Sequence, residues 1–124
     1  MADKFILHLN EVGIDDIPEV GGKNASLGEM NQKLEPKGVN IPGGYVVTAF
    51  AYRYFLEKTE IYEFIKKELE GITTKNLLEL SQKAKNIREK MEKTEFPDDL
   101  KEAILEAHKI AEKKFGKDSS FAVR

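Results

Sequence analysis

Two adjacent glycines and a lysine stand directly before a predicted helix, an arrangement that can bind phosphate. The stretch Val20–Met30 reads VGGKNASLGEM. The free N–H groups and the positive dipole end of a helix N terminus attract anions, and Lys23 adds a full positive charge. Gly21 and Gly22 would let a phosphate approach the backbone with no side chain between them. Because Asn24 follows the lysine, the spacing is not that of a Walker A motif. A solvent-exposed turn is the alternative interpretation of the same residues.

Arg124 is the second residue that could bind an anion. It follows the apolar segment Phe121–Val123, and a guanidinium at the end of a strand can direct paired N–H groups toward a carboxylate or phosphate. An exposed residue at the chain end is the alternative. His8 and His108 have no carboxylate pattern around them, so we expect structural or surface roles for both. The carboxylates show no metal-ligand spacing, and we therefore predict no catalytic residue and no metal ligand in this chain.

The length and composition describe one ordinary globular domain. The chain has 124 residues, of which 40% are hydrophobic, and 20 basic against 22 acidic residues give a net charge of −2. A nearly neutral chain lacks the basic surface that nucleic-acid binding needs, so we expect no nucleic-acid partner. There is no cysteine, no signal-peptide pattern and no apolar run of membrane-spanning length. We therefore expect no membrane partner and a cytoplasmic location.

The first half mixes strand and helix patterns. Residues 5–9 and 45–47 predict strands, and residues 13–22 predict a loop. A helix is expected from Asn24 or Ser26, because Ser26 and Glu29 match a capping box. The expected buried stripe of this helix comprises Leu27, Met30 and Leu34, and a second, aromatic helix is expected after Thr48.

The second half is predicted to be helical. Apolar residues at spacings of three and four indicate helices around 61–69, 77–91 and 100–115, with breaks at Gly71 and Pro97. Three helices with short connections predict a helical hairpin or a small antiparallel bundle. Residues 117–120 predict a loop and residues 121–123 a further strand. A domain that stops inside an apolar strand is unusual, which predicts that the chain is part of a longer protein.

Three ordered blocks resemble the phosphoenolpyruvate synthase family. The first is Val20–Met30, the second is Gly38–Thr48 (GVNIPGGYVVT) and the third is Ser120–Arg124 (SFAVR). In the family the third block continues into Ser-Ser and an acidic segment. The order and spacing of the three blocks make the resemblance specific, and it covers nearly the whole chain.

The resemblance implies a fold and an activity. It implies an α+β chain, the N-terminal subdomain of an ATP-grasp-like nucleotide-binding domain, with a short mixed sheet and a helical hairpin or bundle. Family members convert pyruvate, ATP and water into phosphoenolpyruvate, AMP and phosphate with the help of Mg²⁺. A histidine in a swivelling domain carries the phosphoryl group. By position in the motifs, Lys23 and Arg124 correspond to residues that bind the ATP phosphates.

The resemblance also implies what the chain lacks. The family's Mg²⁺ ligands and its carrier histidine lie beyond residue 124, so neither His8 nor His108 takes the carrier role. We expect one truncated subdomain: a phosphate-facing part (1–58), a helical part (59–116) and the start of a strand (117–124). Its partners would be the rest of the ATP-binding domain and the swivelling domain. We expect no tight ATP binding and no activity from this chain alone. The alternatives are part of a related dikinase, such as pyruvate phosphate dikinase or an antibiotic phosphotransferase, and a free-standing helical interaction module.

Overall fold

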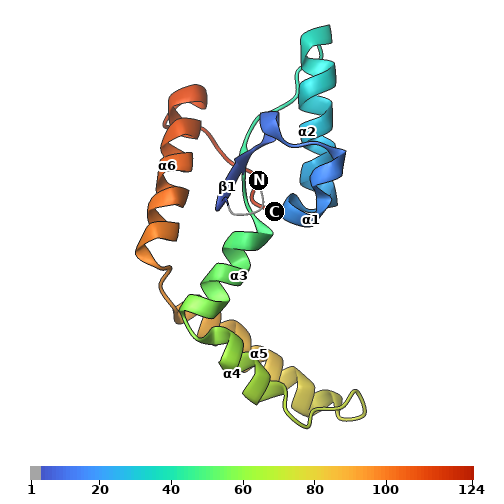
Figure 1. The fold of residues 1–124 in the computed structure, drawn as a ribbon, viewed down its shortest axis with the longest axis vertical. Coiled ribbons are helices and arrows are strands. Elements are labelled where there is room, and N and C mark those ends of the chain that lie inside the picture. The colour runs from blue at the N-terminus through green and yellow to red at the C-terminus, as the bar shows by residue number, and fades with distance from the viewer. Residues whose placement is uncertain (1–3) are drawn as a thin grey trace. The chain divides into compact units, whose positions relative to one another are not determined.

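A computed structural model describes residues 4–124, which form two compact units. The first unit contains the described residues up to Tyr52 together with Asp99–Arg124, and the second contains Arg53–Asp98 (Figure 1). The chain is mostly helical and has one small sheet, which makes it an α+β protein as predicted. Each unit is described by itself below.

The sheet of the first unit has two antiparallel strands, β1 (Ile6–His8) and β2 (Tyr45–Val47). Leu7 is the register partner of Val46. The predicted strands at 5–9 and 45–47 are thus confirmed, with β1 shorter by one residue at each end. The prediction of a mixed sheet is wrong, because this sheet contains only an antiparallel pair. The predicted strand at residues 121–123 is also wrong: this segment has no strand structure, since no neighbouring strand bonds to its backbone.

The segment that was predicted as a loop contains short helical turns. Before it lies the turn η1 (Leu9–Glu11), and within it the turn η2 (Ile14–Asp16) leads into the four-residue helix α1 (Ile17–Val20). The carboxylate of Asp16 accepts a hydrogen bond from the Gly13 N–H at 2.8 Å and so orders this passage. Proline in the first turn of α1 loses no helical hydrogen bond, because that N–H would be unpaired in any case.

Helix α2 (Gly22–Leu34) begins earlier than the sequence predicts and buries a different face. The Ser26–Glu29 capping box is wrong, because α2 already starts at Gly22 and Ser26 lies inside it. Of the predicted stripe, Leu27 is confirmed in part, because it is half-buried against the apolar cluster, whereas Met30 is exposed. The fully buried residues are small or polar instead: Ala25, Gly28 and Asn31. After α2 the turn η3 (Glu35–Lys37), which contains Pro36, ends the helical segment.

The buried face of α2 is small because the helix lies directly on the backbone of η1 and the residue after it. A Cβ atom on Gly28 would be 2.3 Å from the carbonyl oxygen of Val12 and 2.9 Å from that of Leu9. No side chain fits in that space. Leucine or methionine at the inner face would therefore separate the two segments. Behind this contact lies the apolar cluster of the unit: Leu7, Leu9, Val12, Val20, Ala25 and Val46.

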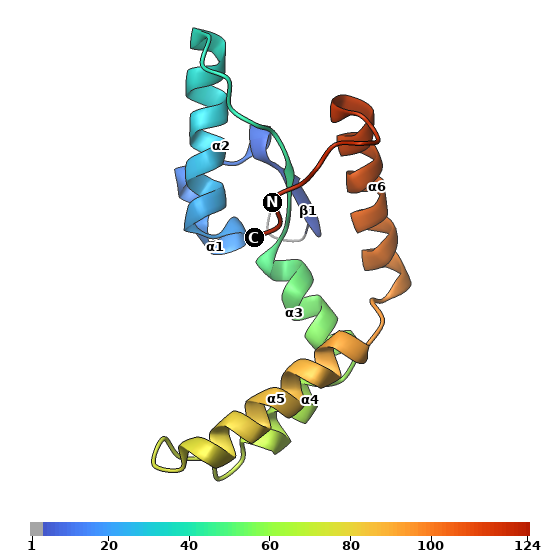
Figure 2. The same ribbon diagram turned by 180° about the vertical axis from the view of Figure 1, so that it is seen from behind.

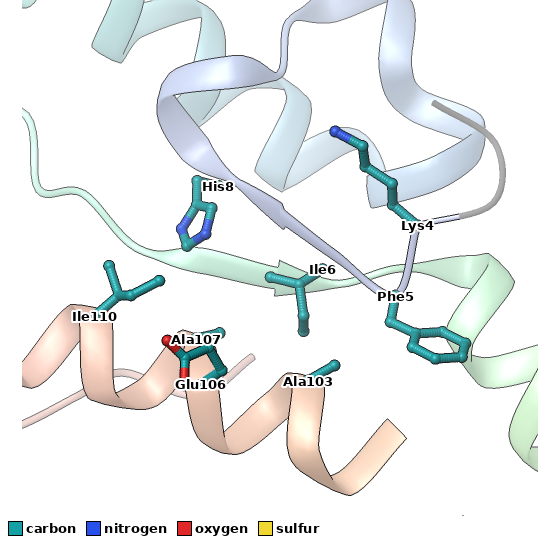
Figure 3. A pocket seen from close by; sticks show the side chains of 8 residues that line it. All are labelled: Lys4, Phe5, Ile6, His8, Ala103, Glu106, Ala107 and Ile110. Carbon is teal, nitrogen blue, oxygen red and sulfur yellow. The ribbon is translucent and has the colours of Figure 1, made fainter. Parts of the chain in front are cut away.

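Helix α6 (Asp98–Phe115) contacts the other face of the sheet. Alternation along β1 sends Leu7 into the apolar cluster, while Ile6 and His8 point toward α6, as Figure 3 shows. The residues of α6 near them include Ala103 and Ala107, whose small side chains let the helix approach the strand. The first unit is therefore layered, with β1 between α2 and α6 when it is seen from either side (Figure 1, Figure 2).

The second unit is a helical hairpin reached through α3 (Ala49–Lys58), which passes from one unit into the other. Its arms are α4 (Ile61–Leu69) and α5 (Leu77–Lys93), which run side by side in both views (Figure 1, Figure 2). Asn76 caps α5 by accepting a hydrogen bond from the Glu79 N–H at 3.1 Å. The hairpin prediction is confirmed. The three-helix bundle is wrong, because nearly all of α6 belongs to the first unit, where it buries Leu100, Ala107 and Ala111.

Among the helices of residues 4–124, none combines the length and the apolar character that a membrane crossing requires.

We predict that Gly28→Ala destabilises the first unit. The added methyl group would overlap two backbone carbonyl oxygens that cannot move without displacing η1, and we expect a loss of about 3 kcal/mol in the free energy of unfolding. The measurement is urea denaturation followed by circular dichroism. Gly22→Ala is the matched control, because nothing lies within 4 Å of its Cβ position. A Gly28→Ala midpoint equal to that of Gly22→Ala would refute the close approach.

Candidate functional site

The N terminus of α2 is formed by a glycine in an unusual conformation. Gly21 has φ 80° and ψ 160°, a region that side-chain-bearing residues rarely adopt. Its N–H donates to Ile17 O at 2.8 Å and closes α1, while its carbonyl accepts from the Ala25 N–H at 3.0 Å and opens α2. One residue therefore ends one helix and begins the next. This explains why α2 starts at Gly22 without a side-chain cap.

The first turn of α2 leaves hydrogen-bond donors free. In the described part of the chain, the backbone N–H groups of Gly22, Lys23 and Asn24 have no acceptor. The Asn24 side chain takes the carbonyl of Val20 instead, at 2.9 Å. Three unpaired donors at the positive end of a 13-residue helix make a small anion-attracting surface.

Lys23 stands on this surface without any ion pair among residues 4–124, and its side chain is exposed. A lysine at a helix N terminus is repelled by the helix dipole and so does not stabilise the helix. Both neighbouring glycines are open, because Cβ atoms on Gly21 and Gly22 would meet nothing within 4 Å. The three residues named from the sequence thus share one exposed turn, where a phosphate group could reach the backbone.

Arg124 is carried by a short segment that turns back after α6. Gly116, with φ 98°, ends α6, and the ring of Phe121 packs on His108 with 5.1 Å between the ring centroids. Arg124 itself is exposed. No hydrogen bond or ion pair of the described residues joins it to the α2 turn. That Arg124 and Lys23 bind the same phosphate chain therefore stays a prediction.

Two hollows lie in the first unit, and neither is lined by Lys23 or Arg124. The first, about 340 Å³, lies between β1 and α6 and is mostly apolar (Figure 3). The second, about 370 Å³, lies beside it toward the end of α6 and includes Gly43, Gly44 and Tyr45. His8, Ala107 and Ile110 line both. The predicted phosphate-binding residues are therefore on an open surface and not in a concave site.

Sequence reasoning missed a small cluster around Tyr45. This residue is the register partner of His8, and its hydroxyl lies 3.4 Å from Nδ1 of His108. Nε2 of His108 lies 3.2 Å from the carboxylate of Glu112, one helical turn further on. Two histidines that are distant in sequence are thus both brought next to one tyrosine. In the sequence, the four-residue spacing of His108 and Glu112 hints at their contact. It gives no indication that Tyr45 lies beside them.

Within residues 4–124, no group of three or more histidine or acidic side chains is arranged to hold a metal ion. The arrangement at α2 suits an anion, because it presents free N–H donors and a lysine that forms no ion pair among the described residues. It can stabilise negative charge on phosphoryl oxygens but offers no base or nucleophile.

The chain belongs to the family described as pyruvate phosphate dikinase, AMP/ATP-binding domain, which matches residues 17–124. The site at α2 thus lies in a domain class that binds adenine nucleotides.

Curated relatives are phosphoenolpyruvate synthases, which confirms the resemblance seen in the sequence. The enzyme of Aquifex aeolicus is 50% identical over 110 residues, which is 88% of this chain and 13% of the relative. That of Neisseria meningitidis is 40% identical over 100% of this chain and 16% of the relative. That of Escherichia coli is 35% identical over 99% of this chain and 15% of the relative. The chain therefore spans less than a fifth of the length of these relatives.

The carboxylate of Glu29 links α2 to the turn before α1. It pairs with Lys33 one helical turn away and accepts a hydrogen bond from the Ile14 N–H at 3.0 Å. The hydrogen bond from Lys33, and after it the one from Ile14, hold the pKa of Glu29 below its ordinary value of 4.5. This contact fixes the start of η2, which leads into α1 and the Gly21 turn.

We predict that this contact is lost in acid. Because the pKa of Glu29 is lower in the folded chain, its contribution to stability is present above the unfolded-state pKa and disappears as the pH falls through the folded-state pKa. The amide signal of Ile14, followed by NMR, should titrate with a midpoint below 4.5. In Glu29→Gln that titration should vanish. An Ile14 midpoint at or above 4.5 would contradict the contact.

Proposed function

We propose that this chain forms the phosphate-facing edge of the ATP site of a phosphoenolpyruvate synthase. The observation that carries the proposal is the turn Gly21–Lys23, where three unpaired N–H groups and an exposed ammonium meet at the start of α2. The adenine-nucleotide-binding family supports the choice of ATP as the ligand, and the names of the relatives support the choice of enzyme.

Lys23 and the α2 N terminus would hold the phosphate chain of ATP electrostatically. The free N–H groups donate to phosphate oxygens, and the open glycines allow the close approach that such bonds need. Lys23 neutralises charge that builds up on the transferred phosphoryl oxygens. Arg124 would add a second cation with a fork geometry suited to phosphate. Mg²⁺ would supply further neutralisation, and its ligands are expected in other parts of the synthase.

A lysine at this position is better explained by binding than by folding. The dipole of α2 repels it, and no carboxylate compensates that repulsion among the described residues. Lys33, at the opposite end of the same helix, is favoured by the dipole and also pairs with Glu29. The contrast between the two lysines of one helix supports an anionic ligand for Lys23.

The reaction proposed for the complete enzyme is the conversion of pyruvate, ATP and water into phosphoenolpyruvate, AMP and phosphate. A histidine of a swivelling domain would carry the phosphoryl group to the pyruvate site. His108 contacts Tyr45 and Phe121 within the first unit, which suits a structural residue and not a mobile carrier. The partners of this chain would be the swivelling domain and the rest of an ATP-grasp-like domain. A cytoplasmic location fits this reaction.

We predict that the isolated chain binds ATP weakly and through Lys23. Two cations on an open surface cannot enclose a nucleotide, so no tight binding is expected in a calorimetric titration. In NMR titrations, ATP should shift the amide signals of residues 21–24. Lys23→Met should weaken this effect about tenfold, the value of one charge-assisted hydrogen bond. Lys37→Met, at the other end of the α2 segment and equally exposed, is the control. Equal effects of the two variants would contradict the role of Lys23.

We also predict that the purified chain forms no phosphoenolpyruvate from pyruvate and ATP. The described residues supply no metal cluster and no concave site around Lys23. A coupled assay for phosphoenolpyruvate, with chromatographic detection of AMP, makes the measurement. Product formed at a rate proportional to the concentration of the chain would refute the prediction.

A further inference from the structure

The second hollow of the first unit has the features of a ligand site that the proposed function does not use. It measures about 370 Å³ and is lined from β1, η1, α2, the residues before β2 and the end of α6. None of its lining residues belongs to the Gly21–Lys23 turn. Segments that are far apart in the sequence therefore converge on a space large enough for a small molecule.

Basic and amide side chains line this hollow. The Nζ atom of Lys114 lies 3.4 Å from the Cβ position of Gly43 and 5.3 Å from the centre of the Phe115 ring, and Lys114 has no ion pair among the described residues. The imidazole of His8 lies in the same lining. Asn31 is only 6% exposed, and its amide nitrogen reaches a single acceptor, Ile41 O, at the long distance of 3.5 Å.

One acidic side chain lies in the lining, and a backbone hydrogen bond holds it in place. The carboxylate of Glu11 accepts the backbone N–H of His8 at 2.9 Å, which holds it at the start of η1. Lys114 and His8 are the basic side chains of the hollow, and Glu11 is the acidic one. The ammonium group of Lys114 pairs with no carboxylate among the described residues, and it therefore favours a ligand with a negatively charged end.

The floor of the hollow is apolar. Ala107, Ile110, Ala111 and Phe115 come from successive turns of α6 and cover the side opposite the strand residues. The edge of the Phe115 ring also limits the width, since its Cζ atom lies 3.2 Å from the Cβ position of Gly43. A fully polar ion would leave this surface without a partner, whereas a hydrocarbon or aromatic body would bury it.

We propose that this hollow binds a small organic carboxylate, whose charged end meets Lys114, His8 and Asn31 and whose apolar body lies on Ala111 and Phe115. The proposal does not depend on the ATP site, because it concerns different residues. Two features of the ligand follow: it carries a compact negative charge, and it has at least a few carbon atoms next to that charge.

The test is an NMR titration of the complete 124-residue chain with three probes: benzoate, acetate and inorganic phosphate. Benzoate should shift the amide signals of Gly43 and Gly44 saturably, and acetate and phosphate should bind more weakly because they lack an apolar body. Phosphate binding as tight as that of benzoate would overturn the carboxylate assignment. Shifts that do not saturate with any probe would overturn the site itself.

Two variants separate the charge from the shape of the hollow. Lys114→Met keeps most of the side chain and should weaken benzoate binding about tenfold, through loss of a charge-assisted hydrogen bond. Lys113→Met is the matched control, because Lys113 occupies the same last turn of α6 but does not line the hollow. Gly43→Ala should also weaken binding, since its methyl group would lie between Phe115 and Lys114 with all charges retained. Equal binding by the two lysine variants would refute the proposal.

Discussion

The contact between α2 and the backbone of the Leu9–Val12 segment governs the first unit, because it determines how close a helix can lie to the rest of the chain. With 2.3 Å between the Cβ position of Gly28 and the carbonyl oxygen of Val12, only a glycine fits. This approach buries Ala25 on one side and Asn31 on the other. The Gln32 amide strengthens the contact by donating to the same Val12 carbonyl at 2.6 Å. Once α2 is held in this way, the position of its N terminus is determined, and with it the position of Lys23.

The middle and the first turn of α2 differ in their surroundings. Gly28 packs tightly on backbone, whereas a Cβ atom on Gly21 or Gly22 would meet nothing within 4 Å. Next to Gly28, Glu29 connects the helix to Ile14 and so to the segment that leads into α1. A rigid helix with an open, donor-rich first turn is a suitable element for holding phosphate, because the donors need no rearrangement when the anion arrives.

Alternation along β1 separates the unit into two sides with different properties. Leu7 faces the apolar cluster, and Ile6 and His8 face α6. Both hollows described above lie on the second side, where alanines of α6 line the space beside the strand. The tight side thus positions the α2 turn, while the looser side contains the carboxylate site proposed above. The two candidate sites therefore depend on different packing contacts.

Local sequence was sufficient for the α+β class, for the strands at 45–47 and within 5–9, and for the α4–α5 hairpin. These elements follow from residue type and spacing over a few neighbours. The turn proposed to bind phosphate was also selected from local signals, since Gly-Gly-Lys before a helix has a physical meaning by itself. The most buried face of α2 was missed, although Leu27 does pack against the apolar cluster, because hydrophobic spacing does not indicate that backbone lies opposite the helix.

Only the tertiary structure decided the elements that depend on distant partners. Residues 121–123 have the composition of a strand, but a strand needs a neighbour to bond to, and in this structure Phe121 packs on His108 instead. Helix α6 has the pattern of a bundle helix, yet it covers the sheet, because the outward residues of β1 provide an apolar surface there. The grouping of His8, Tyr45 and Lys114 around one hollow likewise required the strand register and the placement of α6. Sequence determined which segments could form and which turn could bind an anion, and tertiary contacts determined which faces were buried.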